Sequence, residues 1–91
     1  MGAVTEALER KLNDAFTPSH LQIDDDSARH AGHAGAAPGG ESHFNVVIES
    51  AAFEGVSRLQ RQRMVYRAVA EELAGPVHAL SVKALAPGET A

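Results

Sequence analysis

Apolar and polar positions follow helical and strand periods along the first half of the chain. Apolar side chains recur at three- and four-residue steps between Val4 and Phe16, which predicts an amphipathic helix. The Thr17-Pro18 pair ends this helix, because proline disfavours a helical residue before it. A period of two then predicts a short strand over residues 21–24 and a clearer strand over 43–50. The expected inward side chains of the second strand are Phe44, Val46 and Ile48.

The second half of the chain predicts one more helix and one more strand. Ser57 and Gln60 form a capping box that starts a helix over residues 58–73, and Gly75-Pro76 ends it. A third strand is expected over residues 78–84, with Leu80 and Val82 inward. The side chains that we expect this second helix to bury are Leu59, Val65, Tyr66, Val69 and Leu73. Residues 86–91 are expected to form a flexible tail.

The predicted order α-β-β-α-β defines an α+β fold with both helices on one face of a three-stranded mixed sheet. Two successive strands pair antiparallel, whereas the helical crossover makes the third strand parallel to the second. The connection between the first two strands and the start of the third strand therefore lie at the same edge. This edge brings together histidines that are far apart in the sequence: His30, His33, His43 and His78.

The connection over residues 27–42 is longer than an ordinary hairpin loop, and it is rich in glycine. Imidazole ligates transition metals, so His30, His33 and His78 are candidate ligands. The alternatives are a solvated loop that contains histidines and, for His78, a capping or partly buried residue. We expect His43 to be a surface residue on the open sheet face, and we assign His20 no role.

Composition narrows the classes of protein that remain. The 91 residues predict one domain, residues 1–91, with a formal net charge of −4 and no cysteine. Disulfides and self-contained zinc or iron–sulfur sites with cysteine ligands are therefore excluded. No signal core and no run of about 20 apolar residues is present, which predicts a cytoplasmic protein without a membrane partner. No activated nucleophile is recognisable, so we do not expect an enzyme.

The second predicted helix carries a cluster of basic residues, half of the eight in the chain: Arg58, Arg61, Arg63 and Arg67. Such a helix can contact phosphates, although Phe53-Glu-Gly-Val56 is not a GXXG phosphate-clamping loop. The alternatives are docking of a partner protein, or a solvated face whose charges pair with acids such as Glu54 and Glu71.

Several ordered motifs extend across nearly the whole chain. They are Ser27-x-x-His30, Glu41-Ser-His-Phe44, Phe53-x-Gly55-x-Ser57, Arg61-x-Arg63-x-Val-Tyr66 and Leu73-Ala-Gly-Pro-Val-His-Ala-Leu-Ser81. Together these motifs resemble the BolA family. The resemblance implies a class II KH-like two-layer sandwich, in agreement with the predicted order. The chain departs from the family pattern in a second His-Ala-Gly unit of the loop and in Gln62, where the family often has histidine.

The resemblance also implies a function. Proteins similar to this one bind monothiol (CGFS) glutaredoxins and share a [2Fe-2S] cluster with the glutaredoxin cysteine and a glutathione thiol. By position, His78 matches the C-terminal ligand, and His30 matches the loop ligand, with His33 as its alternative. The expected function is a non-catalytic adaptor for iron–sulfur trafficking or iron regulation. The alternative is a DNA-binding transcriptional regulator that uses the arginine-rich helix.

Overall fold

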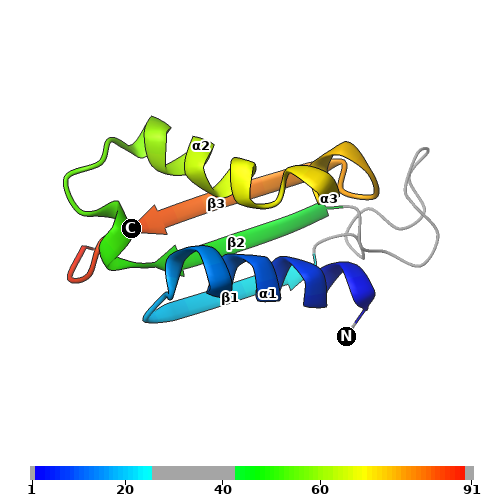
Figure 1. The fold of residues 1–91 in the computed structure, drawn as a ribbon, viewed down its shortest axis with the longest axis horizontal. Coiled ribbons are helices and arrows are strands. Elements are labelled where there is room, and N and C mark those ends of the chain that lie inside the picture. Colours follow the sequence, from blue (N-terminus) through cyan, green and yellow to red (C-terminus); the bar gives the residue numbers. More distant parts are fainter. Residues whose placement is uncertain (1, 26–42, 90–91) are drawn as a thin grey trace.

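Helices cover one face of a three-stranded sheet (Figure 1). The structure is a computed structural model that describes residues 2–25 and 43–89. Its elements in chain order are α1 (Ala3–Phe16), β1 (His20–Asp25), β2 (His43–Glu49), the 3-10 helix η2 (Ala51–Phe53), α2 (Arg58–Ala68), α3 (Ala70–Ala74) and β3 (Ala79–Leu85). Within these ranges, no helix is long and apolar enough to cross a membrane.

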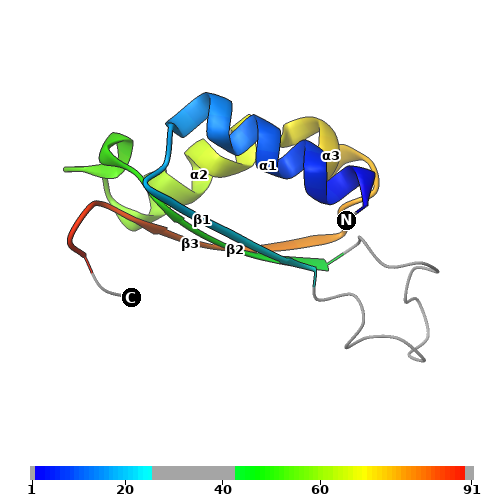
Figure 2. The same ribbon diagram turned by 90° about the horizontal axis from the view of Figure 1, so that it is seen from below.

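The sheet has the topology that the sequence predicts. Its strand order is β1-β2-β3, with β1 antiparallel and β3 parallel to the central β2. Seen edge-on, the helices lie on one side and the other side carries no described helix (Figure 2). The predicted mixed sheet with its helices on one face is therefore confirmed. Consequently β2 and β3 begin at the same end of the sheet, at the right of Figure 1.

The core lies between the helices and the sheet, and it includes a residue that the sequence pattern did not assign to it. The expected inward residues of β2, Phe44, Val46 and Ile48, are confirmed as buried. Phe53, which the hydrophobic pattern did not assign to the core, is fully buried, and its ring lies 5.1 Å from that of Phe16. The other fully buried hydrophobic residues on the helical side of the core are Leu8 and Leu12 on α1, Val65 on α2, and Val69 between α2 and α3.

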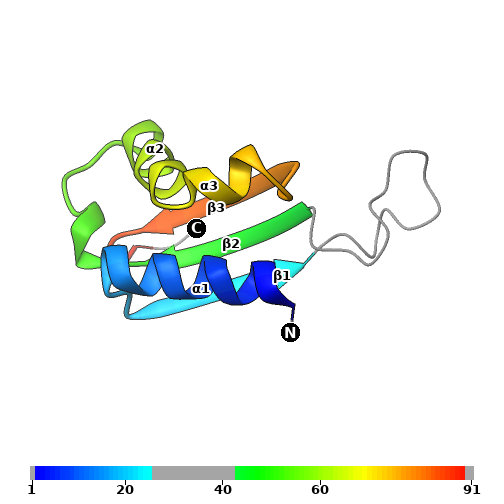
Figure 3. The same ribbon diagram turned by 45° about the vertical axis from the view of Figure 1, so that its right-hand side comes forward.

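The second predicted helix is divided in two. The backbone leaves the helical region at Val69, where φ is −116° and ψ is 30°, and Figure 3 shows the change of direction between α2 and α3. Val65 and Val69 are buried as predicted, whereas the prediction for Leu59 is wrong, because its side chain is 57% exposed. Arg61 takes the inward position instead. Leu59 precedes Arg61 by two residues, about 200° around a helix, and therefore points outward.

Hydrogen bonds from the Arg61 side chain join α2 to Ala84 and Glu89. Arg61 is 6% exposed, and its Nε donates to the Val56 carbonyl at 2.8 Å. Nη1 donates to the Ala84 carbonyl at 3.1 Å, and both terminal nitrogens pair with the Glu89 carboxylate. Ala86 is buried, and its N–H donates to Glu89. The sequence predicted a flexible tail over residues 86–91; within it, Glu89 is bonded to Ala86 and to Arg61, and residues 90–91 lie outside the described residues.

The Arg61–Glu89 pair makes stability depend on acidity. The hydrogen bonds from the Arg61 side chain and the Ala86 amide lower the pKa of Glu89 from 4.5 to about 2. A lowered carboxylate pKa stabilises the fold above pH 4.5, and this contribution is lost as the pH falls from about 4.5 to 2. We expect Glu89→Gln to unfold at a lower urea concentration than the parent at pH 7, with the difference disappearing toward pH 2. A loss that is independent of pH, or equal in the exposed control Glu54→Gln, contradicts this role.

Candidate functional site

Two histidines meet at the end of the sheet where β2 and β3 begin. His43 is the first residue of β2, and it pairs with Ala79 of β3 in the parallel ladder. His78 directly precedes Ala79. The two imidazole rings lie 6.2 Å apart between their centroids and are inclined by 42°. We call this pair, together with the adjoining strand starts, the histidine end of the sheet.

The turn between α3 and β3 presents His78 to solvent. Val77 is buried, and its N–H donates to the Glu72 carbonyl at 2.9 Å. This bond anchors the turn one residue before His78, which is exposed. His43 is half-buried at the start of the central strand. The His78 imidazole can therefore be approached by another molecule while its backbone is held by the core.

The spacing of the pair is slightly too wide for the two rings to share one metal ion. A ring nitrogen binds a metal at about 2.0–2.1 Å, which puts the ring centre about 3 Å from the ion. Two rings that share one ion therefore lie at most about 6 Å apart, less than the 6.2 Å of this pair. Over residues 2–25 and 43–89, no group of three or more histidine or acidic side chains can hold a metal ion. The described residues therefore do not form a complete metal site.

The segment that contains His30 and His33 joins the sheet at this same end. Asp25, the last residue of β1, pairs with Phe44, and His43 opens β2. His30 and His33 themselves lie outside the described residues, so their assignment as ligands stays a prediction. His20, to which we assigned no role, pairs with Glu49 at the opposite end of the sheet.

The position of His43 agrees with the sequence prediction. Its side chain is on the open sheet face as expected, and it neighbours His78 at the edge where the histidines were expected to converge. The signal was present in the sequence, because parallel strands that both start at a histidine bring those residues to one edge. Only the register that pairs His43 with Ala79 determines that the two rings are neighbours.

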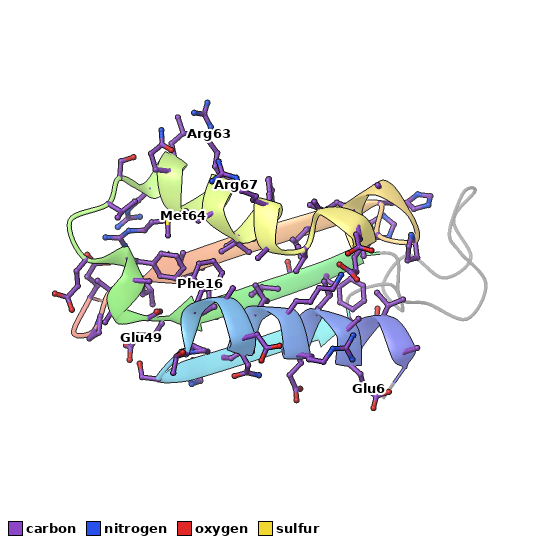
Figure 4. The ribbon with its side chains drawn as sticks, in the orientation of Figure 1. Glu6, Phe16, Glu49, Arg63, Met64 and Arg67 are labelled. Carbon is purple, nitrogen blue, oxygen red and sulfur yellow. The ribbon has the colours of Figure 1, made fainter. Side chains whose placement is uncertain are left out.

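The basic cluster of the second helix is divided by the structure. Arg58, Arg63 and Arg67 are exposed on α2. Figure 4 shows Arg63 and Arg67 projecting from α2 on the side away from α1. The prediction that Arg61 belongs to an exposed surface of four arginines is wrong, because its guanidinium is buried and paired with Glu89. A phosphate-binding surface on α2 therefore has three arginines and not four.

Comparisons with known proteins agree on one family. The family model described as "BolA-like protein" matches residues 12–89. "BolA-like protein 1" of Homo sapiens is 45% identical over 89 residues, which are 98% of this chain and 62% of the relative. "DNA-binding transcriptional regulator BolA" of Escherichia coli strain K12 is 46% identical over 79 residues, covering 87% of this chain and 71% of the relative.

A solved structure extends the similarity to the fold. The BolA domain of SufE1 from Arabidopsis thaliana has a TM-score of 0.87 and 38% identity, and the match covers 99% of each chain. The chain spans about three fifths of the length of the human relative that it matches. The matched residues include α2, β3 and the histidine end of the sheet. The chain belongs to the BolA family.

Proposed function

We propose that this chain is a non-catalytic adaptor that binds a monothiol glutaredoxin and shares a [2Fe-2S] cluster with it. The observation that supports the proposal most strongly is the exposed His78 imidazole beside His43, at the end of the sheet where the 26–42 segment is attached. Family membership adds the partner and the cluster as what the resemblance implies. The adaptor would serve iron–sulfur trafficking or iron regulation.

The donor set of the chain fits a shared cluster and not a resident one. The chain has no cysteine, so every thiolate must come from outside, here from the glutaredoxin cysteine and glutathione. His78 and one loop histidine would supply the other two ligands. Neutral imidazoles in place of two thiolates lower the negative charge of the centre and raise its reduction potential.

Chain length allows either loop histidine to reach His78. Asp25 lies opposite Phe44 on β2, and Ala79 on β3 lies opposite His43, so about 10 Å of sheet separates the two outer strands. The five residues from Asp25 to His30 span up to about 17 Å when extended. His33 is farther along the same segment, and His30 and His33 stay alternatives for the second ligand.

The proposal is tested by adding the intact chain to a cluster-loaded monothiol glutaredoxin with glutathione. Imidazole ligation changes the asymmetry around the iron, so the visible circular dichroism spectrum should change and reach an end point at one chain per cluster. Analytical size exclusion should then show a heterodimer in place of the glutaredoxin homodimer. An unchanged spectrum at excess chain contradicts the adaptor function.

A DNA-binding regulator is the second candidate. It is favoured by the three exposed arginines of α2 and by the name of the Escherichia coli relative. In this case Arg63→Gln with Arg67→Gln should weaken binding to duplex DNA and reduce the slope of log K against log salt by about 0.9 per lost phosphate contact. His78→Ala should leave DNA affinity unchanged. Unaltered DNA binding by the double arginine variant argues against this candidate.

A further inference from the structure

α3 and the turn after it lead to His78, yet the core buries little of α3. None of its five residues is fully buried, although Leu73 packs partly buried against the core. α3 is also separated from α2 by the non-helical backbone at Val69. The position of α2 therefore does not by itself fix that of α3. Other contacts must hold α3 on the helical side of the sheet, where Figure 2 shows it.

The turn is bound to α3 through the backbone carbonyl of Glu72. This carbonyl accepts hydrogen bonds from the Gly75 N–H at 3.2 Å and from the Val77 N–H at 2.9 Å. Val77 directly precedes His78. A displacement of Glu72 is therefore passed through two backbone hydrogen bonds to the residue next to the exposed imidazole.

The side chain of the same glutamate is bound to α1. The Lys11 Nζ lies 3.0 Å from one carboxylate oxygen of Glu72 and 2.8 Å from the other. Only 25% of the Lys11 side chain and 12% of the Glu72 side chain are exposed. Because water and salt screen such a pair less than an exposed one, it contributes more than an ordinary surface ion pair. The hydrogen bond to Glu72 is the largest cause that raises the pKa of Lys11 above 10.5.

Lys11 extends from an element that the core holds directly. Leu8 and Leu12, on the same helix, are fully buried. Glu71 also pairs with Lys11, at 3.2 Å, but its side chain is 89% exposed, and the turn bonds to the carbonyl of Glu72. Glu72 is therefore the residue through which α1 can hold the turn, and Glu71 is a matched comparison beside it.

We propose that Lys11 and Glu72 are positioning residues for His78. Their ion pair holds α3 against α1, and the Glu72 carbonyl holds the turn that presents the imidazole. Neither side chain has to contact the imidazole itself. The importance of this placement rests on the proposed function, because a ligand has to be held within about 0.5 Å of its productive geometry. The anchoring of the turn can be measured in the free chain.

Amide hydrogen exchange of the intact chain tests the anchoring. Without the ion pair, α3 and the turn should open locally. The Val77 N–H should then exchange at least about tenfold faster in Lys11→Met and in Glu72→Gln, relative to the amides of β2 in the same variant. The reference to β2 removes any change in global stability. Lys11→Arg, which keeps the charge, and Glu71→Gln should stay within about twofold of the parent. Equal acceleration of Val77 and β2 in Glu72→Gln, or the same relative acceleration in Glu71→Gln, overturns the proposal.

Titration into cluster-loaded monothiol glutaredoxin tests the consequence for His78. Glu72→Gln and Lys11→Met should need about threefold to tenfold more chain than the parent to reach half of the change in visible circular dichroism. Glu71→Gln should follow the parental curve. A parental curve in Glu72→Gln contradicts the positioning of His78. If the parent chain itself leaves the spectrum unchanged, the adaptor function fails, whereas the exchange of the Val77 N–H still decides whether Lys11 and Glu72 hold the turn.

Discussion

His78→Ala is expected to abolish the change that this chain produces in the visible circular dichroism of a cluster-loaded monothiol glutaredoxin. His78 is the exposed imidazole that the turn after α3 holds at the start of β3. Under the proposed function, its loss removes a ligand from one iron of the shared cluster, and the remaining donors should hold the mixed complex at least about tenfold less tightly. The spectrum should stay that of glutaredoxin alone at concentrations where the parent chain reaches its end point.

The matched control for this variant is His20→Ala. His20 is also an exposed histidine next to β2, but it pairs with Glu49 at the opposite end of the sheet. It should therefore behave as the parent chain does. Both variants should unfold at nearly the parent's urea midpoint, because neither side chain is part of the buried core. If His78→Ala gives the full parental spectrum, His78 is not a ligand.

Phe53→Ala is expected to destabilise the fold far more than the truncation of any exposed side chain. The Phe53 side chain is fully buried and packs against Phe16 with ring centroids 5.1 Å apart. Truncation of a buried phenylalanine costs about 3–5 kcal/mol of unfolding free energy, because apolar contacts are lost and a cavity is left. Small domains are stable by only about 5–15 kcal/mol, so the urea midpoint should fall sharply.

Leu59→Ala is the informative control for this prediction. The hydrophobic pattern assigned Leu59 to the core, whereas the structure leaves 57% of it exposed. Truncation of an exposed side chain changes stability by no more than about 0.5 kcal/mol. A loss for Leu59→Ala that equals or exceeds that of Phe53→Ala would show that the hydrophobic pattern, and not the structure, gives the correct orientation of α2.

The order of elements and the shape of the sheet could be predicted from the sequence because local signals agree with one another. Phe44, Val46 and Ile48 recur at every second position and are buried, and Ser57 accepts from the Gln60 N–H as the capping motif predicts. The orientation of α2 could not be predicted, because it depends on residues distant in the sequence. Arg61 can be buried only because Glu89, 28 positions later, neutralises it.

The candidate site, like the fold, could be predicted from the sequence only in part. The topology alone indicates that His78 lies at the end of the sheet where β2 begins. The proximity of His43 required the strand register, which the hydrophobic pattern does not specify beyond the choice of face. The ligand assignments of His30 and His33 come from the resemblance and from chain length, and the described residues do not include them.

The most direct test of imidazole ligation is pulsed electron paramagnetic resonance of the reduced mixed complex. The chain would be prepared with ¹⁵N-histidine, and the glutaredoxin would be unlabelled. Iron-bound imidazole should give a strong ¹⁵N hyperfine coupling in the parent complex, and His78→Ala should lose the coupling of that nitrogen. A reduced cluster in the mixed complex without directly coupled ¹⁵N would contradict histidine ligation by this chain.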